Sequence, residues 1–118
     1  MANNFDRGES IPVTVNCDDE DGANLDVGNF VTIVVKVIHK HLQTELDRFS
    51  LADSTVTLGS PTSGGNVTFI IPQSVTATAA IGMYEYQVKT TETDASYENS
   101  TRNRTFRGDC FYLKKALT

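Results

Sequence analysis

The residues best suited to chemistry are the carboxylates gathered between positions 18 and 26. Asp18-Asp19-Glu20-Asp21 is followed, after Gly22, by Asp26, and calcium prefers several oxygen ligands of this kind. The candidate metal ligands are Asp19, Asp21 and Asp26. With Gly22 at the sixth place of an EF-hand loop, however, the first and twelfth ligand positions would be Cys17 and Gly28. We therefore favour a solvated turn, since Asp side chains and a Gly at positive φ suit turns.

His39 and His41 are a second candidate metal pair. If one strand continues through both, their side chains share a face and could bind one metal ion. The sequence offers no identifiable third ligand. A solvated or interfacial pair is the favoured interpretation.

The two cysteines, Cys17 and Cys110, leave two alternatives open. On the first and last strands of a sandwich they could approach each other and form a disulfide. Two reduced and separately buried thiols are the favoured alternative. Neither cysteine has the basic, histidine-paired setting that marks a nucleophile.

Other signals for chemistry are missing or misplaced. Arg107-Gly108-Asp109 matches the integrin-recognition tripeptide, but it falls within an alternating strand instead of at a loop tip. There is no Gly-x-Ser-x-Gly turn and no phosphate-binding glycine loop. We expect neither enzymatic activity nor a cofactor.

The composition limits the partners. The chain has 118 residues, 39% hydrophobic and 21% charged, which fits one folded domain, 1–118, with a core at about 6–113 and a polar N-terminal tail. The formal charge is -5, and the one basic cluster, Arg102, Arg104 and Arg107, has acidic neighbours, so no nucleic-acid partner is expected. No apolar run approaches the length of a membrane helix, so no membrane partner is expected.

Apolar residues that recur at every second position predict strands, and no alternation of strands with helices is visible. The expected inward faces are Ile11, Val13, Val15 and Cys17; Val31, Ile33, Val35 and Val37; Val67, Phe69 and Ile71; Tyr84, Tyr86 and Val88; and Phe106, Cys110 and Tyr112. Pro12 indicates an edge strand. The sequence therefore predicts an all-β, immunoglobulin-like antiparallel β-sandwich of about seven strands.

Three segments are less regular. Residues 40–52 are expected to form a loop and a short strand near Arg48–Leu51, with a short helix as the alternative. Residues 74–80 contain enough alanine for one helical turn, which Gly82 ends. Tyr84 then occupies either a corner that anchors its hydroxyl or a simple core position. Residues 94–103 are expected to be a polar loop.

The order of these signals resembles the immunoglobulin-like N-terminal domain of phage upper baseplate proteins and related small tail and virion proteins. The matching motifs are Arg7-Gly8-Glu9, Asp21-Gly22, Leu25-Asp-Val-Gly28, Gly65-Asn-Val-Thr68, the Thr/Ala-rich turn at 76–80, and Gly82-Met-Tyr-Glu-Tyr-Gln-Val88. They span about residues 6–113. The segment 39–52 is longer than the family pattern, and the Arg/Asn-rich stretch before Phe106 departs from it.

The resemblance implies a structural protein of the virion, assembled in the host cytoplasm as a tail, baseplate or neck component. Its partners would be other phage structural proteins, met in multiple copies in a symmetric assembly. The expected contact segments are the polar termini and the loop at 92–104. The alternatives are a capsid decoration protein and a receptor- or carbohydrate-binding module; the four tyrosines favour the latter and the lack of Trp opposes it.

Overall fold

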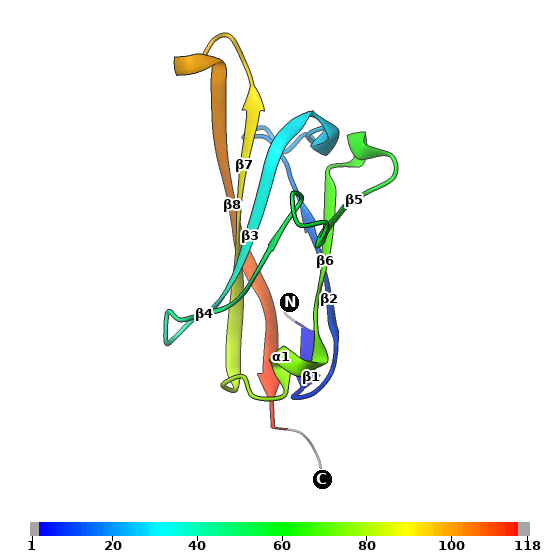
Figure 1. The fold of residues 1–118 in the computed structure, drawn as a ribbon, viewed down its shortest axis with the longest axis vertical. Helices are drawn as coiled ribbons and strands as arrows, with labels where there is room; N and C mark the ends of the chain where they lie inside the picture. The colour runs from blue at the N-terminus through cyan, green and yellow to red at the C-terminus, as the bar shows by residue number, and fades with distance from the viewer. Residues whose placement is uncertain (1–2, 116–118) are drawn as a thin grey trace.

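A computed structural model describes residues 3–115 of the chain. Eight strands account for most of it (Figure 1). They are β1 (Asn3–Asp6), β2 (Ile11–Asn16), β3 (Phe30–His39), β4 (Glu45–Ser50), β5 (Val56–Leu58), β6 (Asn66–Ile71), β7 (Gly82–Thr93) and β8 (Thr101–Lys114). The short helices are η1 (Val27–Asn29), η2 (Thr62–Gly64), α1 (Gln73–Thr76) and η3 (Glu98–Ser100).

The strands form two packed sheets. One has the order β1-β8-β7-β3-β4 and the other the order β2-β6-β5. This is the immunoglobulin arrangement, in which strands B, E and D face strands C, F and G, with a further strand beside C. The predicted fold class is confirmed. The one parallel pair joins β1 to β8, and the structure has eight strands where the sequence predicted about seven.

The core lies between the sheets and is built from alternate residues. On β2, Ile11, Val13 and Val15 are buried while Pro12 and Thr14 are exposed. The same period recurs on β6 and β7, as predicted, because successive side chains of a strand point to opposite faces. β2 is also the edge strand that its proline predicts.

Two residues predicted to point inward, Val31 and Tyr112, are exposed, and a β-bulge explains each. In the β3–β7 ladder Phe30 pairs with Glu92 and Thr32 with Thr91, so Val31 is an extra residue, and its side chain is 63% exposed. In the β7–β8 ladder the extra residue is Cys110, after which Phe111 and Leu113 are buried and Tyr112 is 40% exposed. A bulge shifts the alternation by one residue, so a single uninterrupted alternation cannot describe the side chains on both sides of it.

The prediction of a polar N-terminal tail is also wrong within the described residues. Asn3–Asp6 form β1, which pairs with Phe111–Lys114 at the edge of the larger sheet. Phe5 supplies the packing, since its ring meets Phe111 edge-on at a centroid distance of 6.3 Å. One apolar residue in a four-residue strand is too little for a periodic signal.

The irregular segments mostly follow the prediction. Residues 40–52 contain a turn and the short strand β4, and α1 supplies the helical turn. Tyr84 takes the corner position: it is 2% exposed, and its hydroxyl donates a hydrogen bond of 2.6 Å to the Ala80 carbonyl. In the part of the chain that the structure describes, no helix is long and apolar enough to cross a membrane.

Candidate functional site

Three loops meet at one end of the sandwich, opposite β1 and α1 (Figure 1). They are residues 17–29 before β3, residues 59–65 before β6, and residues 94–100 between β7 and β8. The Cys17 N–H donates to the Gly65 carbonyl at 2.7 Å, which ties the first loop to the second. We call this surface the loop end.

The acidic turn is held by hydrogen bonds between its Asp side chains and its own backbone. The Asp19 Oδ1 accepts hydrogen bonds from the backbone N–H groups of Asp21 and Ala23, both at 2.9 Å. The Asp26 Oδ1 accepts from the Gly28 N–H at 2.9 Å and caps η1. Among residues 3–115, no group of three or more His, Cys, Asp or Glu side chains could hold a metal ion. The candidate ligands Asp19, Asp21 and Asp26 are therefore not brought together.

An ion-pair network fixes the base of the β7–β8 hairpin. Arg104 Nε lies 2.6 Å from Glu92 Oε1, with side chains only 13% and 19% exposed. Glu20 of the acidic turn lies 3.8 Å from Arg104 and 3.9 Å from Arg102. The Arg102 guanidinium stacks 4.9 Å from the Tyr97 ring centroid. Two residues of the basic cluster, Arg102 and Arg104, thus pair with carboxylates of their own chain.

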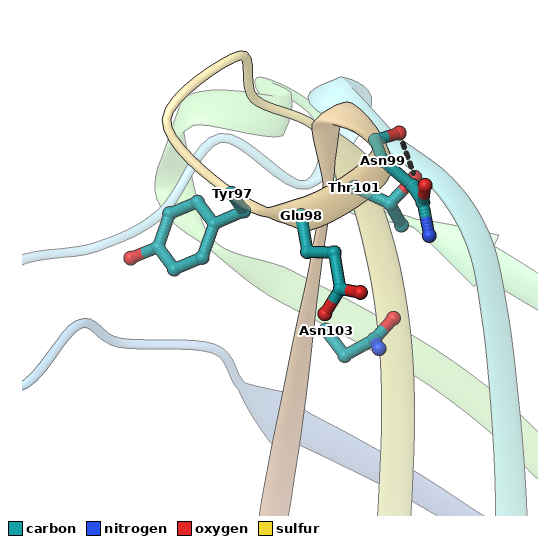
Figure 2. Close-up of a pocket in the computed structure, with 5 residues that line it drawn as sticks. All are labelled: Tyr97, Glu98, Asn99, Thr101 and Asn103. Carbon is teal, nitrogen blue, oxygen red and sulfur yellow. Dashed lines mark hydrogen bonds between the residues drawn. The ribbon is translucent and has the colours of Figure 1, made fainter.

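The hairpin tip carries an open hollow of about 570 Å³ (Figure 2). Its lining residues are Tyr97, Glu98, Asn99, Thr101 and Asn103. Asn99 and Ser100 adopt left-handed backbone with φ of 57° and 55°, and the Thr101 hydroxyl donates to the Asn99 carbonyl at 3.2 Å. The hollow offers a carboxylate, amides and one aromatic ring, which suit contact with a polar surface. It contains no nucleophile beside a base.

The predicted loop at 92–104 is largely strand. Thr91, Glu92 and Thr93 pair with Asn103, Arg102 and Thr101, so that only residues 94–100 connect β7 to β8. The strand character of this segment is hard to recognise in the sequence, because the first residues of β8 are Thr, Arg and Asn and no apolar residue marks the alternation. Exposed and half-buried positions nevertheless alternate along Thr101–Cys110.

Within residues 3–115, the outer edge of β8 is unpaired over residues 101–110. The described residues of β1 pair with Phe111–Lys114 on that edge. Within the described residues, the backbone of 101–110 pairs with β7 alone. Arg107-Gly108-Asp109 lies in this open stretch, as predicted within a strand, and Asp109 forms an ion pair with Lys40 at 3.0 Å. We call residues 101–110 the open edge.

The two histidines do not form a pair. β3 ends at His39, so His41 lies in the following turn and is exposed. His39 is buried, accepts at Nδ1 from the Leu42 N–H (3.0 Å) and donates from Nε2 to the Ile81 carbonyl (2.9 Å). Both ring nitrogens are occupied, which leaves none for a metal. The prediction of a shared face failed because the strand stops between them.

The two cysteines carry free thiols. Burial, with a smaller contribution from Asp18, raises the pKa of Cys17 to about 11. Burial raises the pKa of Cys110 to about 12. Because the thiolate is the reactive form, both thiols are protected in the folded chain.

Native cysteine reactivity should therefore be low. At pH 8 a pKa raised from 9.0 to about 11 lowers the thiolate population of Cys17 about a hundredfold. We expect iodoacetamide to alkylate the native chain at least about a hundredfold more slowly than the chain in urea. A Thr57→Cys variant, with an exposed thiol on β5, provides the reactive control. Rapid native labelling of Cys17 or Cys110 would contradict the expectation.

Comparison with known proteins adds no assignment. No family model matches the chain, no curated protein matches it, and no solved structure matches it.

Proposed function

We propose that this chain is a non-enzymatic structural component of a bacteriophage particle, a tail, baseplate or neck protein that acts through protein–protein contacts. The observation that carries the contact role is the open edge of β8, which exposes backbone hydrogen-bonding groups beside the loop end. Open edges pair readily with further strands. The described residues offer polar and aromatic contact groups at the hairpin tip but no arrangement suited to catalysis.

The phage assignment rests on the ordered series of motifs. Arg7-Gly8-Glu9 joins β1 to β2, Gly65-Asn-Val-Thr68 begins β6, and Gly82 to Val88 forms the first part of β7. Their order along the chain is that of the baseplate-associated domains that the sequence resembles. The symmetric assemblies of such particles use many copies of one contact.

The composition of purified particles tests the proposal. We expect quantitative mass spectrometry to find the chain in particles that survive a density gradient and a high-salt wash. Tens of copies per particle would support a tail or baseplate position, whereas hundreds would replace it with a capsid decoration role. Absence of the chain from washed particles would overturn both.

A further inference from the structure

The four sheet edges differ in how well they are protected from pairing. β5 has three residues, and β2 carries Pro12, which cannot donate a ladder hydrogen bond. β4 has six residues and carries the charges of Glu45, Asp47 and Arg48. The open edge of β8 is the longest of these, contains no proline, and carries two charged side chains, Arg107 and Asp109, among its five exposed residues. Its length leaves more backbone unprotected than any other edge of the described residues.

The same strand edge already pairs at its far end. β1 lies along Phe111–Lys114, which shows that the backbone of β8 is accessible from that side. The half-buried face of the open edge is held rigid by the Arg104–Glu92 ion pair, and by Phe106, whose ring lies 6.4 Å from Phe30. A pre-formed strand loses little entropy when a second strand joins it.

We infer that the open edge pairs antiparallel with the same edge of a second copy of this chain, about a two-fold axis at Thr105. The exposed face of the edge presents Thr101, Asn103, Thr105, Arg107 and Asp109. In this register Thr105 lies opposite itself. Asn103 lies opposite Arg107 of the second copy, and Thr101 lies opposite its Asp109.

Charge selects this register. It places no like charges directly opposite, and such pairs destabilise a ladder. On the half-buried face Arg104 lies opposite Phe106 of the second copy, a cation–π arrangement. The two Arg104 side chains become diagonal neighbours, but each is already paired with Glu92 of its own copy. If the two-fold axis lay at Phe106 instead, the two Arg107 side chains would become diagonal neighbours across the ladder. The paired stretch would then also include the bulged residue Cys110. If one copy of the strand shifted by one residue along the other, exposed residues of one copy would lie opposite half-buried residues of the other.

The length of the open edge also fits this register. Pairing over 101–109 stops before Phe111, where Asn3 of β1 begins. The result is a continuous sheet with the strand order β4-β3-β7-β8 in each copy, joined at β8. An interface of one strand pair buries less than the roughly 800 Å² per partner of a standard stable complex. The dimer should therefore be concentration-dependent, with a dissociation constant in the micromolar to millimolar range.

The inference deepens the proposed function and rests on it for its biological meaning. Sedimentation equilibrium of the purified full chain between about 10 μM and 1 mM tests it. We expect the mass to rise from 12.9 kDa towards twice that value. A Thr105→Glu variant sets two carboxylates opposite each other on an exposed face and should weaken association at least about tenfold. The matched control, Thr57→Glu on exposed β5, should associate like the parent chain.

A cysteine cross-link tests the register independently. Thr105→Cys places two thiols opposite each other across the two-fold axis, at a separation that a disulfide can bridge. We expect mild oxidation to give a covalent dimer with Thr105→Cys and not with Thr57→Cys. A parent chain that stays monomeric at 1 mM, or a dimer that Thr105→Glu leaves unchanged, would overturn the inference. Either result would leave the particle-composition experiment to decide the proposed function separately.

Discussion

Replacing Tyr84 with alanine should lower the free energy of unfolding by about 3–5 kcal/mol, as expected for a large buried aromatic residue. The ring is 2% exposed and stacks on Phe111 at a centroid distance of 5.0 Å. It also meets the His39 ring edge-on at 5.0 Å. Truncation would therefore leave a cavity between β3, β7 and β8.

The phenylalanine variant isolates the hydroxyl. Tyr84→Phe keeps the ring and removes only the 2.6 Å hydrogen bond to Ala80, so the expected loss is about 1–2 kcal/mol. Urea unfolding followed by circular dichroism measures both variants. Tyr112→Phe is the control, because Tyr112 is 40% exposed and should change stability by less than about 0.5 kcal/mol. A Tyr84→Phe variant as stable as the parent would show that the corner hydrogen bond contributes nothing net.

The sequence predicted the fold because most strands here alternate without interruption. Ile11, Val13 and Val15 reveal a half-buried strand from composition alone, since a period of two has no helical counterpart. The errors lie at Val31 and Tyr112, each placed by a bulge. A bulge depends on how two strands pair, and that information is not contained in either strand alone.

The motifs behind the family resemblance turn out to be structural anchors. Arg7 Nε donates to the Ala79 carbonyl at 2.8 Å, and the Gly8 N–H donates to the Thr76 hydroxyl at 3.1 Å. Thr76, which is fully buried, donates in turn to the Glu9 carbonyl at 2.8 Å. These contacts hold the chain where it crosses from one sheet to the other, so the motifs bear on the fold more directly than on a binding surface.

The candidate contact surface could not be read from the sequence in the same way. An open edge is defined by which strands fail to pair with it, and here that depends on where β1 starts along β8, with Asn3 opposite Phe111. The polar residues of early β8 also hide its strand character. The segment 92–104, which the sequence analysis predicts as a contact segment, overlaps the open edge at residues 101–104.

Gly82→Ala should be among the most destabilising single substitutions in the chain. Gly82 has φ of +135°, and a Cβ atom there would lie 2.7 Å from His39 Nε2 and 3.1 Å from Cε1. The imidazole cannot move away freely, because both its nitrogens are hydrogen-bonded. Backbone strain of about 1–3 kcal/mol and overpacking of about 1–3 kcal/mol predict a combined loss of about 2–5 kcal/mol.

A double-mutant cycle separates the two contributions to that loss. Gly22→Ala is the matched control, since Gly22 also has positive φ, +83°, but no heavy atom within 4 Å of the added Cβ. It should show the backbone strain alone. Adding Gly82→Ala to a His39→Ala background removes the imidazole, so its cost there should fall to about that of the control. Equal costs of Gly82→Ala with and without the His39 ring, measured by urea unfolding, would refute the steric explanation and leave φ as the sole cause.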